Sequence, residues 1–172
     1  MDLESYRDKI RLAARERAGA PIYNGSPDHA AIIVEELFLS ANSHVRLLSG
    51  DLNARVYGAP GVVRRAREFL SHSNHDLRIL LERETYSPSH PLIEEMAGQR
   101  NVKIAVMPQS IRDALKYHFM TADEDCFRFE PEKELHVAVA AFGDRPTTGN
   151  LNEIFETIWD LSEQRPVAAF AE

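Results

Sequence analysis

The sequence predicts an α/β domain with a mixed, mainly parallel sheet flanked by helices. Its 172 residues suit a single domain. In the middle of the chain, short apolar runs alternate with amphipathic segments, a pattern typical of βαβ units. After residue 117 the apolar runs follow one another closely, which indicates antiparallel or mixed strands.

Capping signals and periodicity place the individual elements. Ser26 is expected to cap a helix that begins at Pro27, with Asp28 in its first turn. Turn-forming residues indicate a turn before that helix and a loop over 143–150. The other expected helices cover residues 3–18, 60–72, 90–99 and 150–164, and the expected strands cover 44–50, 76–82, 101–108, 117–123, 126–130 and 135–142.

These elements predict three parts of the chain. Residues 1–25 form an N-terminal helix and turn, residues 26–165 form the α/β domain, and residues 166–172 form a tail. We expect that deletion of the N-terminal helix leaves the domain folded.

The composition limits the class of protein. The chain is 44% hydrophobic and 27% charged, which is ordinary for a globular protein. No apolar run approaches 18 residues, and the first residues have no signal-peptide core, so we expect a cytoplasmic protein that does not bind membranes. The single cysteine, Cys126, excludes an internal disulfide and a multi-cysteine metal site. We expect neither a metal nor a cofactor.

The charge balance disfavours nucleic acid as a partner. With 27 acidic and 20 basic residues, the chain has a net charge of −7, whereas phosphate-backbone binders usually carry a basic surface. Arg64, Arg65 and Arg67 form the densest basic group. The sequence allows this group to be either a solvated helix face or a local nucleic-acid contact.

The segment YHFMTADEDCFRFEP, residues 117–131, carries the strongest functional signal. On a strand, His118 and Met120 share one face, and Tyr117 and Phe119 share the other. Histidine is a frequent acid, base or nucleophile in catalysis, but a lone histidine on a strand is more often a structural hydrogen-bonding group.

The order of elements over residues 27–164 resembles one half of the phospholipase D superfamily. The closing helix also carries Phe155 and Trp159 four residues apart, as in that family. Its signature is His-x-Lys, four residues, then Asp. Here His118 matches the histidine, Asp125 matches the aspartate, and Met120 replaces the lysine. The downstream Gly-Ser/Thr-x-Asn element is weak.

The resemblance implies specific roles for these residues. In members that cleave phosphodiesters, the histidine attacks phosphorus and the lysine stabilises charge on the phosphoryl oxygens. Met120 has no charge and donates no hydrogen bond. If the site is active, His118 and Asp125 are its catalytic residues; if it only binds a ligand, His118, Met120 and Asn150 contact that ligand. Cations that could replace the lysine are Lys116, Arg128 and Lys103.

These observations favour a non-catalytic phospholipase D-like domain that acts by protein interaction or by binding a phosphorylated ligand. Because the family site requires two motifs and this chain has one, we also expect a homodimer. The first alternative is a phosphodiesterase or nuclease with a dimeric site that uses His118. The second is a nucleic-acid-associated regulatory module.

Other motifs carry less information. The sequence allows the acidic cluster Asp123–Asp125 to be either a cation site or a tight turn between strands. His72 and His75 have metal-like spacing but lie at an expected helix end, where histidine is favourable. Phosphate-loop, Gly-x-Ser-x-Gly and Cys-x-x-Cys patterns are absent from the sequence.

Overall fold

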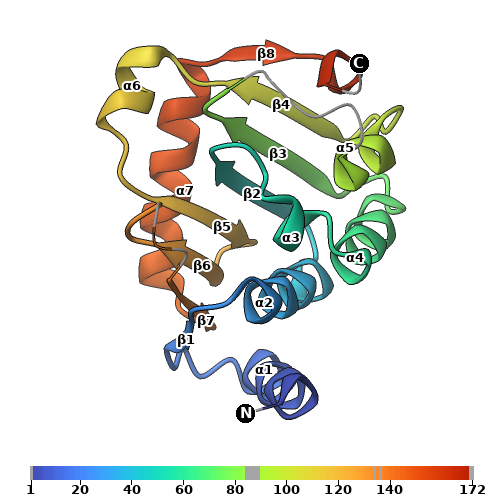
Figure 1. Ribbon diagram of the computed structural model, residues 1–172, viewed down its shortest axis with the longest axis vertical. Helices are drawn as coiled ribbons and strands as arrows, with labels where there is room; N and C mark the ends of the chain where they lie inside the picture. Colours follow the sequence, from blue (N-terminus) through green and yellow to red (C-terminus); the bar gives the residue numbers. More distant parts are fainter. Residues whose placement is uncertain (1, 84–89, 134, 136, 171–172) are drawn as a thin grey trace.

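The computed structural model describes residues 2–83, 90–133, 135 and 137–170, and Figure 1 shows their arrangement. Their strands form one mixed sheet in the order β1-β7-β6-β5-β2-β3-β4-β8. The strands are β1 (Ile22–Asn24), β2 (His44–Ser49), β3 (Asp76–Leu81), β4 (Val102–Val106), β5 (His118–Ala122), β6 (Cys126–Glu130), β7 (Ala138–Phe142) and β8 (Glu163–Arg165).

The mixed α/β architecture is confirmed, but antiparallel pairing has a larger share than expected. Only the β2–β3 and β3–β4 ladders of the described sheet are parallel. The other five ladders are antiparallel. Two of the antiparallel strands, β1 and β8, are three residues long: β1 lies where the sequence indicates a turn, and β8 overlaps the end of the helix expected over 150–164. Strands this short have no detectable period of two.

Helices cover both faces of the sheet. The helices are α1 (Leu3–Glu16), α2 (Pro27–Ser40), α3 (Ala54–Tyr57), α4 (Pro60–Leu70), α5 (Pro91–Met96), α6 (Gln109–Ala114) and α7 (Arg145–Asp160), with a 3₁₀ turn at Val167–Phe170. One apolar core joins α1, α2, α4 and α5 to the sheet, and a second core lies between the opposite face and α7 (Figure 1). Among the described residues, no helix combines the length and the hydrophobicity that a membrane crossing requires.

The expected start of α2 is confirmed. The Ser26 side chain accepts a hydrogen bond from the backbone N–H of His29, and Pro27 takes the first helical position. The expected loop over 143–150 is wrong, because α7 begins at Arg145. The Asp144 side chain accepts a hydrogen bond from the backbone of Thr147, and this cap starts a helix in a segment whose composition suggests a turn.

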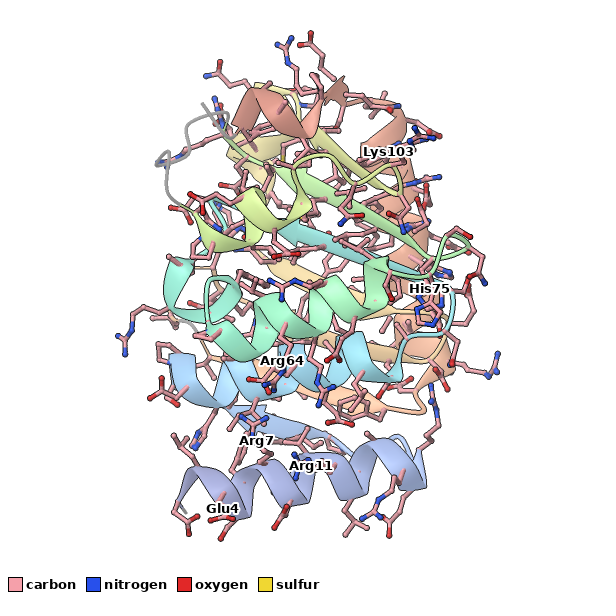
Figure 2. The ribbon with its side chains drawn as sticks, turned by 90° about the vertical axis from the view of Figure 1, so that its right-hand side faces the viewer. Glu4, Arg7, Arg11, Arg64, His75 and Lys103 are labelled. Atoms are coloured by element: carbon pink, nitrogen blue, oxygen red, sulfur yellow. The ribbon has the colours of Figure 1, made fainter. Side chains whose placement is uncertain are left out.

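The N-terminal residues 2–25 pack against the rest of the chain. Tyr6 and Ile10 on α1 are 5% and 0% exposed and belong to the same apolar core as α2. At the end of α1, Arg17 forms an ion pair with Asp125 at 2.7 Å. Strand β1 then joins the sheet beside β7. Figure 2 shows α1 lying along α2 at one end of the molecule.

The described part of the tail also contacts the domain. Val167 and Phe170 are 8% and 4% exposed and belong to the core on the α2 side of the sheet. Residues 171 and 172 lie outside the described part of the chain.

Replacement of Ile10 with alanine tests how strongly α1 stabilises the domain. Ile10 is fully buried, so Ile10→Ala is expected to lower the free energy of unfolding by about 2–4 kcal/mol. Leu12→Ala is the matched control, because Leu12 lies on the same helix and is 47% exposed. Urea denaturation measures both. Equal effects of the two substitutions would show that α1 does not pack as described.

Candidate functional site

His118 lies where three strands bring their ends together. Strands β2 and β3 run parallel and finish at this edge, and β5 runs antiparallel to β2, so its first residue starts there. A Cβ on Gly50, just after β2, would lie 3.2 Å from Cε1 of His118 and 3.6 Å from Oε2 of Glu82. A glycine at this position therefore allows the imidazole and the Glu82 carboxylate to approach the backbone.

Glu82 is the direct partner of His118. Its Oε1 lies 3.1 Å from Nε2 of His118 and accepts a hydrogen bond from Nζ of Lys133 at 2.8 Å. Burial raises the pKa of Glu82, but the hydrogen bonds from Lys133 and His118 outweigh burial and hold the pKa below its usual value. An ionised carboxylate only accepts hydrogen bonds, so Nε2 of His118 carries the shared hydrogen.

A cavity of about 400 Å³ opens beside His118. We call it the Arg128 cavity; its polar lining includes Ser49, Tyr57, His118, Arg128, Glu130 and Lys133. Arg128 is 3% exposed, and its Nη1 lies 3.4 Å from Glu130. Burial raises the pKa of Tyr57 to about 12, so its phenol stays neutral.

Met120 and Arg128 are direct neighbours across the sheet. They are register partners in the antiparallel ladder of β5 and β6, so their side chains lie on the same face. Met120 is fully buried in the apolar core, whereas Arg128 reaches the cavity that His118 lines. A cation is therefore present one strand away from Met120, the position at which the resemblance to the phospholipase D superfamily leads us to expect a lysine.

The other two cations that the sequence offers have different positions. Lys116 lines a second cavity on the other side of His118. Lys103 is the register partner of Arg78 on β3, and the Arg78 guanidinium lies over the Trp159 ring of α7. Because register partners share a face, Lys103 lies on the α7 face of the sheet, away from His118.

The structure separates the other predicted site residues from His118. Asp125 lies in the turn after β5, where Arg17 is its ion-pair partner, and the hydrogen bond from Arg17 lowers the pKa of Asp125. Asn150 lies on α7 and lines an apolar groove together with Ile111 and Ile154. Neither residue is among the described lining of the two cavities that contain His118.

Contacts within the chain hold the acidic turn between β5 and β6 in place. The Asp123 carboxylate accepts hydrogen bonds from the backbone N–H groups of Asn42, Ser43 and His44 at 2.7–2.9 Å. Glu124 lies 3.4 Å from the His44 ring. This arrangement agrees with the tight-turn interpretation of Asp123–Asp125. Burial raises the pKa of the neighbouring Cys126 to about 11, so its thiol is neutral.

The basic group on α4 is partly neutralised by carboxylates. Arg65 pairs with Glu68 at 2.6 Å, and Arg67 pairs with Glu95 at 2.5 Å. Figure 2 shows Arg64 on the same side of the molecule as Arg7 and Arg11 of α1. Arg7 in turn pairs with Glu35 of α2. This face therefore carries mixed charge.

His72 and His75 stack on each other with ring centroids 4.6 Å apart. The Nδ1 of His75 lies 2.8 Å from the carbonyl oxygen of Phe69, so it donates to that carbonyl. Within the described residues, no cluster of three or more His, Cys, Asp or Glu side chains is arranged to hold a metal ion.

Sequence reasoning missed Glu82 and Lys133. Glu82 ends an apolar run, so the sequence predicts it as the last residue of a strand. An acidic residue at the carboxyl end of a parallel strand could have pointed to it, because ligands often bind at that edge of a sheet. Lys133 follows β6 in a short loop and has no distinctive pattern around it.

Solved structures share this fold. The chain matches Nuc, a phospholipase D family member from Salmonella typhimurium, with a TM-score of 0.60 and 13% identity over 86% of this chain and 99% of Nuc. It matches NucT from Helicobacter pylori with a TM-score of 0.59 and 11% identity over 86% and 98% of the two chains. It also matches TrmBL2, an archaeal chromatin protein that binds DNA, with a TM-score of 0.61 and 12% identity over 93% of this chain and 60% of that chain.

The domain therefore has the phospholipase D-like α/β fold. No curated protein matches the sequence significantly. The chain belongs to the family described as Domain of unknown function (DUF7931), whose model matches residues 26–168.

Replacement of Glu82 with glutamine tests the Glu82–His118–Lys133 contact. Glu82→Gln is expected to lower the free energy of unfolding by about 1.5–3 kcal/mol at pH 7, because it removes a buried, charged hydrogen-bond acceptor. The folded state lowers the pKa of Glu82 from its ordinary 4.5, so this stability is present above pH 4.5. It is lost as the pH falls through the lower, folded-state pKa.

Chemical denaturation of both proteins between pH 3 and pH 8 measures this difference. Glu95→Gln is the control, because its ion pair with Arg67 lies at the surface and is expected to contribute less than about 1 kcal/mol. A difference between wild type and Glu82→Gln that does not depend on pH would contradict the assignment.

Proposed function

We propose that this domain binds a phosphorylated ligand in the Arg128 cavity without cleaving it. The observation that carries the proposal is the position of Arg128 opposite Met120, in the same cavity as His118. A guanidinium has five N–H donors in a fixed plane and matches the geometry of phosphate oxygens. Arg128 contacts Asn24, Glu130 and Tyr57, and a guanidinium with five N–H donors can bind a phosphate oxygen in addition to three such partners.

Two further features favour an anion. Lys133 lies in the same lining and supplies a second cation. Ser26 and Pro27, at the start of the 14-residue helix α2, also line the cavity. The positive end of the helix dipole therefore adds to the field of the two side chains.

The set of side chains favours binding over cleavage. Cleavage of a phosphodiester through a phosphohistidine requires an acid that protonates the leaving oxygen. His118 is the sole histidine among the described residues that line the Arg128 cavity and its neighbour. Among the described residues, these two cavities therefore hold one candidate nucleophile and no second imidazole to act as the acid.

Removal of the Arg128 charge tests this function. Arg128→Met is expected to weaken the binding of inorganic phosphate about 10- to 100-fold, since a charged hydrogen bond is lost. Arg128→Lys should retain part of the affinity. Because Arg128 is buried, circular dichroism must show that both variants are folded, and the more exposed Lys133→Met provides a second variant with the same expected direction. Titration calorimetry that finds no phosphate binding to the wild-type chain would refute the proposal.

A phosphodiesterase with a dimeric site is the second candidate, and the contact between His118 and Glu82 favours it. When Nε2 donates its hydrogen to Glu82, Nδ1 of a neutral imidazole keeps the lone pair. That nitrogen could attack phosphorus while the phosphorus–oxygen bond to the leaving group breaks. His118 of a second copy would then supply the proton, which makes a homodimer part of this candidate.

Hydrolysis of bis-p-nitrophenyl phosphate separates the two candidates. For a binding domain, we expect the wild-type chain to show no more turnover than His118→Ala, because a domain that only binds its ligand does not use His118 as a nucleophile. Light scattering at micromolar concentration should accompany the assay. Turnover that disappears in His118→Ala and rises with dimer content would favour the phosphodiesterase.

A further inference from the structure

His118 lies between two cavities, and the second one has its own cations. This neighbour, which we call the Arg112 cavity, has a volume of about 700 Å³. Both cavities fall within the size range of small-molecule sites. They share Asp51, His118 and Lys133 in their linings, whereas Arg128 belongs to one cavity and Arg112 to the other.

Cations reach the Arg112 cavity from separate segments of the chain. Arg83 follows β3, Arg112 lies on α6, Lys116 precedes β5, and Lys133 precedes β7. Together, the described linings of the two cavities contain five lysine and arginine side chains against four carboxylates. The whole chain has a net charge of −7, so this region is more positive than the remainder of the protein.

Contacts within the lining pair part of the charge of both signs. Glu82 is bound by Lys133 and His118, and Asp113 lies 3.7 Å from Nε of Arg112. Arg112 is also held in place, because its Nη1 donates to the carbonyl oxygen of Glu82 at 3.2 Å. The guanidinium is therefore positioned at the wall of the cavity before any ligand arrives.

We propose that the site takes a small molecule with two phosphate groups. One phosphate binds in the Arg128 cavity beside His118, and the other binds in the Arg112 cavity against Arg83, Arg112 and Lys116. This inference rests on the proposed function, because the first phosphate occupies that site. The shared Lys133 and His118 lie between the two subsites.

A small ligand fits the charge distribution better than a nucleic-acid strand does. A strand carries phosphates beyond any single pocket and depends on an extended basic surface. The net charge of −7 and the ion pairs of Arg65 and Arg67 with carboxylates disfavour such a surface here. A small molecule with two phosphate groups needs only the two adjacent cavities to bind both of its charges.

Fructose 6-phosphate and fructose 1,6-bisphosphate are suitable probes, because they differ by one phosphate. In titration calorimetry, the wild-type chain is expected to bind the bisphosphate at least 10-fold more tightly. The double variant Arg83→Ala/Lys116→Ala should lose this preference. Arg128→Met should weaken the binding of both sugar phosphates. Lys103→Ala is the matched control, since Lys103 is an exposed cation on the other face of the sheet and should keep the preference.

The outcomes separate this inference from the proposed function. If inorganic phosphate and both sugar phosphates fail to bind to the wild-type chain, both proposals fail. If inorganic phosphate binds and neither sugar phosphate does, this inference alone is refuted. If fructose 6-phosphate binds and the bisphosphate binds no more tightly, the second subsite alone is refuted. A preference that persists in Arg83→Ala/Lys116→Ala would also refute it, because the second phosphate would then lie elsewhere.

Discussion

The register of β5 between β2 and β6 decides which side chains reach the site. In this register Met120 lies opposite Leu47 on one side and Arg128 on the other. Because successive side chains alternate between faces, a slip of one residue would turn His118 towards α7 and bring Phe119 to the cavity. The slip is opposed by Phe119, which is 1% exposed and packs edge-on against Phe155 of α7.

The same register places the buried cation Arg128 directly beside Met120. Position 120 is fully enclosed by the apolar core on the α2 side, where a charge would be costly and a methionine fills space well. Arg128 is also buried, but Glu130 and the Asn24 oxygen lie within 3.4 Å of its guanidinium. These partners offset part of the desolvation cost that an isolated charge would carry.

The sequence predicts the order of the main elements well and the site only in part. The Ser26–Pro27 cap and the buried runs of β2, β3 and β4 are local signals, and each is confirmed. The contacts of Glu82 with His118 and Lys133 join residues that lie 36 and 51 positions apart in the sequence, and such pairings depend on strand register rather than on local pattern. The start of α7 was missed because its Asp144 cap lies in a turn-like composition.

The network around Glu82 joins the segments that form both cavities. Its side chain binds His118 and Lys133, and its carbonyl oxygen accepts from Arg112. The backbone N–H of Lys133 also donates to the carbonyl oxygen of Lys116 at 3.0 Å, so the loop before β7 is tied to the entry of β5. Groups that are held before a ligand binds lose less conformational entropy on binding. Through these contacts Glu82 fixes the positions of Lys133 and Arg112, two of the cations that line the cavities beside His118.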